Sequence, residues 1–491
     1  MLKDIKNTIR QSAVYGFSRV ATKLVSFILL PVYSIYFTVE EYGVISRIET
    51  LWQLMFAVFL FGLESGIVRW YSKIDDPESK KKFLFSVSIS MLVINFFFTV
   101  LVFSGSGMLS DLIFQTDKYY NLIFFAALIA AMEAFVFVEF LLLRINEQAF
   151  RYSFFSVLIA VLNLLIQLYY IFYTQNKLEG VFIAKIISPA VVLLILLPYY
   201  LGFLKIGFDL KNLKELFIYS FPVMLAAVAG TLLNQSDRFI LGYLDSQEDV
   251  GLYSLAYNIC GLLNFFVIAP YALAFSVISW KKHESENAAR FFTKNITYLF
   301  FTIIYLALAL SLAIPSLIKI FALNKDYWTA KDIVPWIAVS MPFYGISIIG
   351  FFSFYVTKKT YYILYFTIFC LIVNVTLNII LIPHFKMYGA AISNFVSFFL
   401  QCYLNYKFSK KNYFFDYEWK KMFLMLLVFV ILVFPFFYFQ MNDFTFLNVF
   451  LKILAFAGFP VILYFFRFYE PIELERVNGF INKYLKIKSK L

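Results

Sequence analysis

Residues 181–203 read VFIAKIISPAVVLLILLPYYLGF, a run in which one lysine is the only charged residue. An α-helix rises 1.5 Å per residue, so about 20 such residues cross a hydrocarbon core roughly 30 Å thick. Strands of a membrane barrel would alternate apolar and polar residues over about ten positions, whereas Val191 to Leu197 do not alternate. The run therefore predicts a transmembrane α-helix.

Runs of this kind recur from Ser12 to Phe468, separated by short loops. Of the 491 residues, 62% are hydrophobic and 15% are charged, whereas soluble domains carry about 25% charged residues. The expected fold class is therefore an all-α integral membrane protein with about 14 transmembrane helices. We predict these helices over residues 12–38, 45–71, 83–103, 120–143, 153–174, 181–203, 216–244, 251–278, 294–321, 334–357, 361–383, 388–406, 422–439 and 447–466.

The net charge of +12 would suggest a nucleic-acid partner in a soluble protein, but here the loops explain it. Alternate loops and the two termini hold 28 Lys and Arg residues, and the opposite loops hold 5. Because Lys and Arg accumulate in cytoplasmic loops, both termini are expected in the cytoplasm and the number of helices is expected to be even. The Lys/Arg-poor segments are 39–44, 104–119, 175–180, 245–250, 322–333, 384–387 and 440–446.

An internal repeat divides the chain. Residues 40–46, EEYGVIS, resemble residues 248–254, EDVGLYS, and residues 179–185 resemble residues 388–394 at nearly the same offset. The repeat predicts two six-helix lobes with the same orientation, related by a pseudo-two-fold axis along the membrane normal, as in alternating-access transporters. The predicted boundaries are 1–203 and 204–406 for the lobes, and 407–491 for two additional helices and a basic cytoplasmic tail.

Ionisable residues inside transmembrane helices are costly and are candidates for function. Arg19 and Lys23 lie four residues apart, on one helical face, about 10 and 16 Å from the cytoplasmic end. Glu64 is expected at the depth of Arg19, and Glu133 at the depth of Lys23. The candidates for substrate binding are Arg19, Lys23, Arg47, Lys185 and Arg238, and those for ion coupling are Glu64, Glu133 and Asp237.

The alternative is a structural role. Asp237 with Arg238, and Arg47 with Glu49, can form ion pairs that only fix helix packing. Arg19, Lys23, Glu64 and Glu133 can likewise form a buried network. These alternatives stay open at the level of the sequence.

Features of enzymes are missing from the sequence. It contains no GxxxxGK[ST] loop for ATP, and its two histidines lie in predicted loops. The three cysteines lie in apolar stretches without the spacing of a metal site. We therefore expect a transporter without catalytic residues, metal or cofactor, with H⁺ or Na⁺ as the candidate coupling ion.

Three stretches resemble a known family: SAVYGFSRVATKLVSFILLPVYSIYFTVEEYGVIS at 12–46, NQSDRFILGYLDSQEDVGLYSLAYN at 234–258 and NVTLNIILIPHFKMYGAAISN at 374–394. They are similar to the polysaccharide-transporter branch of the multidrug/oligosaccharidyl-lipid/polysaccharide (MOP) exporter superfamily. This branch holds the Wzx-type flippases of O-antigen (lipopolysaccharide) and capsule repeat units. The resemblance covers essentially the whole chain.

The resemblance implies two lobes around a cavity, and two extra helices as in the related lipid II flippase. In the lipid II flippase, cationic residues of the first two helices line that cavity. Arg19, Lys23 and Arg47 of this sequence resemble them in the helix that carries them and in their positive charge. The implied cargo is an undecaprenyl-diphosphate-linked oligosaccharide in the bacterial cytoplasmic (inner) membrane. The implied partners are membrane lipids, a polysaccharide polymerase and the chain-length machinery.

Two rival functions remain. One is an ion-coupled multidrug or small-molecule exporter of the same superfamily, and the other is an integral-membrane polymerase of the cell envelope. A cationic first helix and two extra helices favour the flippase, since a pump for cationic drugs would prefer an acidic cavity.

Overall fold

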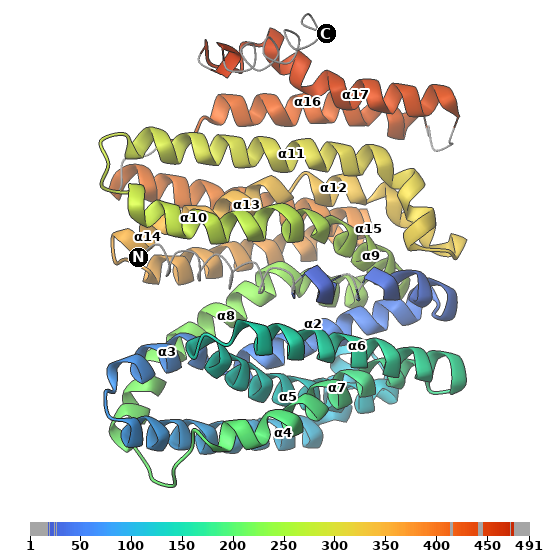
Figure 1. Ribbon diagram of the computed structural model, residues 1–491. Helices are drawn as coiled ribbons and strands as arrows, with labels where there is room; N and C mark the ends of the chain where they lie inside the picture. Colours follow the sequence, from blue (N-terminus) through green and yellow to red (C-terminus); the bar gives the residue numbers. More distant parts are fainter. Residues whose placement is uncertain are drawn as a thin grey trace, which may run out of the picture. The chain divides into compact units, whose positions relative to one another are not determined.

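The computed structural model describes residues 18, 20–23, 25, 27–412, 416–439, 445–471 and 473–475, and these residues form helices and connecting turns without any strand (Figure 1). The α-helices are α2 Val39–Phe59, α3 Leu63–Lys73, α4 Pro77–Phe114, α5 Tyr120–Ile145, α6 Ala149–Tyr173, α7 Lys177–Leu201, α8 Leu210–Leu244, α9 Gln247–Leu263, α10 Ala269–Lys282, α11 Ala288–Phe321, α12 Val334–Ala338, α13 Met341–Gly350, α14 Phe352–Val356, α15 Tyr361–Asn412, α16 Trp419–Tyr438 and α17 Phe446–Phe465. Shorter segments are η1 Asp117–Tyr119, the π-helical η2 Asn264–Ile268 and η3 Lys325–Asp332.

Twelve helical segments of the described chain are long and apolar enough to cross a membrane. One of them, α15, has 52 residues and is broken at Lys386, and a shorter apolar helix, Val20–Tyr36, precedes α2. With α15 counted as two helices and Val20–Tyr36 included, every one of the fourteen predicted segments has a helix. The prediction of an all-α protein with many transmembrane helices is confirmed.

The chain divides into two compact units. The first unit contains Met1–Ser254, Ile320–Tyr327 and Tyr361–Ser393, and the second contains Leu255–Lys319, Trp328–Thr360 and Asn394–Leu491. These bounds differ from the lobes expected at 1–203 and 204–406, which stay a prediction.

The predicted loop 104–119 is largely helical, because α4 continues to Phe114. The serines of this segment bond the helix itself: Ser104 Oγ donates to the Val100 carbonyl and Ser106 Oγ to the Phe103 carbonyl, each at 2.9 Å. Serine side chains that bond their own backbone are tolerated inside a helix. The expected boundary at residue 103 was therefore wrong.

The predicted helix 45–71 is interrupted between α2 and α3. Phe61 and Gly62 adopt positive φ angles of 53° and 66°, which end α2 and redirect the chain. A Cβ atom on Gly62 would lie 2.5 Å from the Ser220 carbonyl oxygen of α8. Glycine is needed here both for its backbone conformation and for this close approach.

The two segments of the first repeat match, residues 40–46 and 248–254, contact each other in the structure. Ser46 Oγ donates a 2.6 Å hydrogen bond to Ser254 Oγ, 208 residues away, which is the offset of the repeat. A Cβ atom on Gly43 would lie 1.9 Å from the Gln247 carbonyl oxygen, and one on Gly251 would lie 2.2 Å from the Val39 carbonyl oxygen. Because Val39 and Gln247 are also related by this offset, α2 and the start of α9 contact each other reciprocally, as across a two-fold axis.

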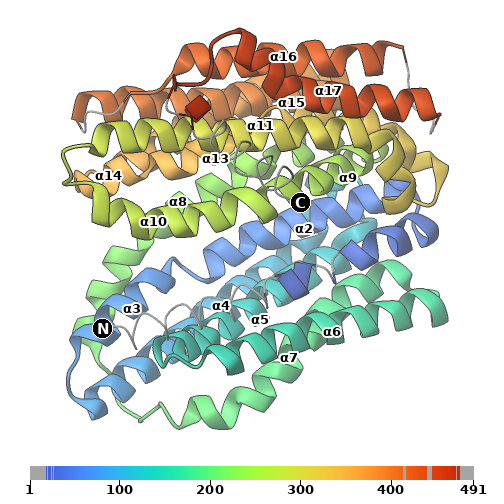
Figure 2. The ribbon, with the colours of Figure 1, turned by 45° about the horizontal axis from the view of Figure 1, so that its top comes forward.

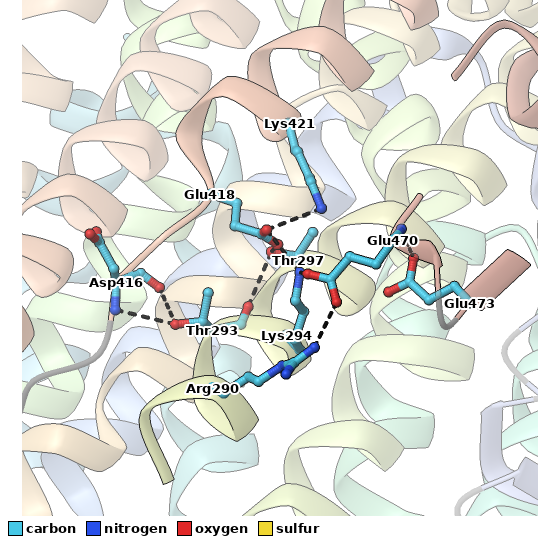
Figure 3. A network of polar contacts seen from close by, with 9 residues as sticks. All are labelled: Arg290, Thr293, Lys294, Thr297, Asp416, Glu418, Lys421, Glu470 and Glu473. Carbon is cyan, nitrogen blue, oxygen red and sulfur yellow. Dashed lines mark hydrogen bonds and ion pairs between the residues drawn. The ribbon is translucent and has the colours of Figure 1, made fainter. Parts of the chain in front are cut away.

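In the second unit, an ionic clamp holds the last two helices on α11 (Figure 3). Lys294 Nζ lies 2.9 Å from Glu418 Oε1, just before α16, and 2.5 Å from Glu470 Oε1, after α17. Arg290 and Lys421 pair with the same two carboxylates, at 2.9 Å from Glu470 and 3.1 Å from Glu418. One lysine of α11 thus bridges both ends of the α16–α17 hairpin.

Aromatic stacking continues this attachment along the helices. The rings of Tyr305 on α11 and Phe456 on α17 stack with centroids 4.2 Å apart. Phe459, one turn further along α17, contacts both Tyr305 and Phe301. The two C-terminal helices are therefore held by apolar contacts along their length and by charge at one end.

Candidate functional site

A cavity of about 370 Å³ lies inside the first unit, and residues of α2, α5, α6 and α7 line it. These four helices lie side by side in the ribbon of Figure 2. Its polar lining is Glu133, Arg144, Asn163, Lys185 and Ser188, and its aromatic lining is Trp52, Phe56, Phe137, Phe140 and Tyr152. Charged side chains around a cavity within apolar helices mark a pathway or binding site for charged ligands. This cavity is the candidate functional site.

Lys185 of α7 is central to the cavity lining. It forms an ion pair and hydrogen bond with Glu49 of α2, and its Nζ lies 4.7 Å from the ring centroid of Trp52. Trp52 Nε1 donates a 2.9 Å hydrogen bond to Glu133 Oε2. Lys185 therefore contacts Glu49 directly and is connected to Glu133 through the Trp52 ring. A change in the charge of one of these groups affects the others.

The helix that carries Lys185 is weakened at this position. Pro189, which also lines the cavity, lies four residues further along α7. Proline has no backbone N–H, so the Lys185 carbonyl loses its usual helical donor. Such a break allows bending of α7 next to the ion pair.

A second ion pair lies at the other end of the cavity lining. Arg144, in the last turn of α5, lies 3.7 Å from Glu64 in the first turn of α3, and both side chains are about half exposed. Glu64 was expected at the depth of Arg19, which lies outside the described residues. Arg144 was missed because the sequence placed it in a loop.

Lys23 is half-buried, and its Nζ lies 5.8 Å from the Phe27 ring centroid. It also interacts electrostatically with Glu49, the partner of Lys185. Arg19 lies outside the described residues. The structure therefore relates Lys23 to the Glu49–Lys185 pair.

Arg47 occupies a different environment from the cavity. Its side chain is only 1% exposed and donates to the carbonyl of Ile113 at the end of α4 and, at 3.4 Å, to that of Phe239 in α8. Its guanidinium lies 4.7 Å from the Phe114 ring centroid, and Gly242 leaves room for it. These contacts join three helices, which favours the structural alternative for Arg47.

Asp237 and Arg238 are buried and are not among the residues that line the cavity. The Tyr253 hydroxyl donates to Asp237 Oδ2, and Arg238 Nη1 lies 3.4 Å from Gln235 Oε1. Gln235 in turn bonds Gln53 and Thr50 of α2. This second polar group lies between α2, α8 and α9.

The cavity thus brings together two of the predicted residues, Lys185 and Glu133, and reaches Glu64 through Arg144. The sequence missed Glu49 as the partner of Lys185, because it suggested Arg47 as the partner of Glu49. It also missed Trp52, for which the sequence offers no signal, because a tryptophan in an apolar helix is usually part of its surface.

The N-terminal half of the chain matches a family model described as polysaccharide biosynthesis protein, over residues 8–279, and residues 222–380 match the MatE model. Two proteins of Haemophilus influenzae are similar: an uncharacterized membrane protein, 25% identical over 53% of this chain, and Lsg locus putative protein 1, 24% identical over 50%. The matched region covers 62% and 59% of the length of these relatives.

Solved structures share the fold over most of the chain. Lipid II flippase MurJ in an inward closed conformation is 17% identical, with a TM-score of 0.72, and the match covers 94% of this chain and all of that one. An inward-facing multidrug resistance MATE family transporter of the MOP superfamily is 14% identical, with a TM-score of 0.62, over 82% of this chain and 97% of that one. The chain therefore belongs to the family whose model is described as polysaccharide biosynthesis protein.

Proposed function

We propose that this protein is a flippase that moves undecaprenyl-diphosphate-linked oligosaccharide repeat units from the inner to the outer leaflet of the bacterial cytoplasmic membrane by alternating access, with both termini in the cytoplasm. The family match and the likeness to a lipid II flippase support this class of cargo. The excess of Lys and Arg on one side of the helices supports the orientation. A polymerase and chain-length machinery would receive the product.

The observation that carries the proposal is the Lys185–Glu49 ion pair beside Glu133 in the cavity. A diphosphate is a stronger hydrogen-bond acceptor than one carboxylate and can displace Glu49 from Lys185. Lys23, and the exposed Arg144 that pairs with Glu64, offer further cationic contacts to the diphosphate. Arg19 stays a predicted contact. A cationic cavity lowers the barrier for the diphosphate, while the lipid tail remains in the bilayer.

Displacement of Glu49 from Lys185 by the diphosphate leaves the Glu49 carboxylate without its cation. Removing one partner of a fully buried ion pair costs about 3–5 kcal/mol when the other stays charged, and the partly buried Lys185–Glu49 pair, 13% and 30% exposed, loses less. A proton or Na⁺ on Glu49 or Glu133 removes this cost, so cargo binding and ion binding become linked. Our candidates for coupling are Glu133 in the cavity, Glu64 beside Arg144, and Asp237 beside Tyr253.

Complementation of a strain that lacks the gene tests the proposal. Lys185→Met should reduce surface polysaccharide at least tenfold at equal protein level, with lipid-linked repeat units accumulating in the inner leaflet, whereas Lys185→Arg should retain part of the export. Lys177→Met is the matched control, because Lys177 begins the same helix but contacts Tyr36 and does not line the cavity. Normal export by Lys185→Met would contradict the role of the cavity.

The match of residues 222–380 to the MatE model favours a second candidate, an ion-coupled exporter of small molecules. Under this function, deletion of the gene would sensitise cells to cationic drugs and leave surface polysaccharide unchanged. That result would replace the flippase proposal.

A further inference from the structure

The break in α15 has an unusual backbone. Lys386 adopts φ 50° and ψ −131°, a combination that residues with a side chain rarely occupy. Three residues further on, a Cβ atom on Gly389 would lie 2.7 Å from the backbone of Leu381. The backbone therefore approaches itself closely at the break, and surrounding contacts must hold Lys386 in place.

Those contacts come from the corner between α8 and α9. Lys386 Nζ lies 3.2 Å from Asp245 Oδ1 and 3.2 Å from Asp249 Oδ2. Asp245 ends α8, and Asp249 lies in the first turn of α9, where its N–H donates to Ser246 Oγ at 3.1 Å. One lysine side chain thus ties the break in α15 to this corner, entirely within the first unit.

The two carboxyl groups are close to each other as well as to the lysine. Asp245 and Asp249 lie within hydrogen-bonding reach, and their side chains are 15% and 13% exposed. Asp245 Oδ2 is buried and accepts no hydrogen bond. Two ionised carboxylates repel at this distance, whereas one shared proton gives a hydrogen bond and, with Lys386, a cluster of zero net charge.

Segments 245–250 and 384–387 both belong to the Lys/Arg-poor side, which is expected to face outward. We propose that Asp245, Asp249 and Lys386 form a latch on the outer side that closes when it takes up a proton, and that the closed latch fixes the break in α15. The proposal does not depend on which cargo the protein carries.

The direction of the pH effect follows from linkage. Burial, and then the neighbouring Asp249, raise the pKa of the Asp245 carboxyl from 3.8 to about 6, although Lys386 acts in the opposite direction. Asp249 and Lys386 are the charged groups that act on Asp245 in the described chain. A carboxyl released into water returns to its ordinary pKa, so the closed latch binds the proton more tightly than the open one. As the pH falls from about 6 to 4, the ratio of closed to open latch should rise by about thirtyfold.

Hydrogen exchange of the full-length protein in lipid nanodiscs tests this directly. Amide protection of residues 380–392, corrected for the intrinsic pH dependence of exchange, should rise at least fivefold between pH 7.5 and pH 5. A segment of α4 serves as the internal reference. Asp245→Asn, which mimics the protonated carboxyl, should be protected at both pH values, and Lys386→Met should lose protection at both.

The matched control is Asp326→Asn, an exposed carboxylate in η3 on the same side, which should keep the wild-type response. Equal protection of the wild-type segment at pH 7.5 and pH 5 would overturn the proposal, and this measurement needs no variant. A full wild-type response in a folded Asp245→Asn protein would overturn it as well.

Discussion

Lys294→Met should loosen the α16–α17 hairpin by an amount that the clamp geometry predicts. The substitution removes a cation that is 17% exposed and bonds two carboxylates, each 23–30% exposed. Breaking a fully buried pair costs about 3–5 kcal/mol, and an exposed pair contributes about 0–1 kcal/mol. Lys421 and Arg290 still pair with Glu418 and Glu470 after the change, so neither carboxylate is left alone. We therefore expect a loss of about 2 kcal/mol in the local opening free energy.

Hydrogen exchange measures this opening. A loss of about 2 kcal/mol corresponds to roughly thirtyfold faster exchange of the slowest amides in residues 419–438. Lys420→Met is the control, because Lys420 is exposed and no ion pair is found for it in the described chain. Exchange within threefold of wild type in Lys294→Met, or equal acceleration in the control, would refute the assignment of the clamp.

The clamp should also respond to acid. Burial acts to raise the pKa of Glu418, but hydrogen bonds from Lys294, Thr297 and Lys421 outweigh it and hold the pKa below its usual value of 4.5. A carboxylate with a lowered pKa stabilises the folded state above its unfolded pKa and loses this contribution as the pH falls through the folded pKa. Hydrogen exchange of the hairpin, corrected for the intrinsic pH dependence of amide exchange, should thus be constant from pH 8 to 5 and accelerate below about 4.5.

Three further predictions concern the first unit. Gly43→Ala should severely reduce the yield of folded protein, because the new Cβ would lie 1.9 Å from a backbone carbonyl oxygen, whereas Gly105→Ala, which has open space around it, should not. Similar yields of monodisperse protein for the two variants on size-exclusion chromatography would contradict this prediction. Arg47→Met should lower the free energy of unfolding by about 2 kcal/mol or more and should not be rescued by Lys, which lacks the flat guanidinium that lies 4.7 Å from the Phe114 ring centroid; a melting temperature like that of wild type would argue against the structural role. Trp52→Phe removes the donor to Glu133 and should shift the pH dependence of transport at unchanged protein level; an unchanged profile in vesicles would exclude the Trp52 hydrogen bond from coupling.

The sequence predicts the helices well but not their contacts. Each predicted segment has a helix because length and hydropathy decide whether a segment spans a membrane. Counting residues also predicts the depth of a residue in the membrane. It cannot predict which helix faces which, so Glu133 was only expected at the depth of Lys23, and its hydrogen bond with Trp52 was not predicted.

The predicted helix boundaries are wrong where backbone geometry, rather than hydropathy, decides where a helix ends. The break at Phe61 and Gly62 interrupts an apolar run whose hydropathy does not change, so only packing against α8 reveals it. Arg144 was assigned to a loop for a related reason, because α5 continues one turn beyond its apolar run.

The Ser46–Ser254 hydrogen bond has a meaning for the history of the chain. A residue on a two-fold axis meets its own counterpart, so before an ancestral gene duplicated and fused, these two serines would have been one residue in two identical subunits. Only residues that tolerate their own copy at close range can occupy such a place, as serine does through its hydroxyl and glycine through its missing side chain. Elsewhere the two halves can diverge, because a residue does not contact its own counterpart in the other half. This constraint explains why the repeat is still legible at 40–46 and 248–254, where the copies touch, after most of the remaining sequence has drifted apart.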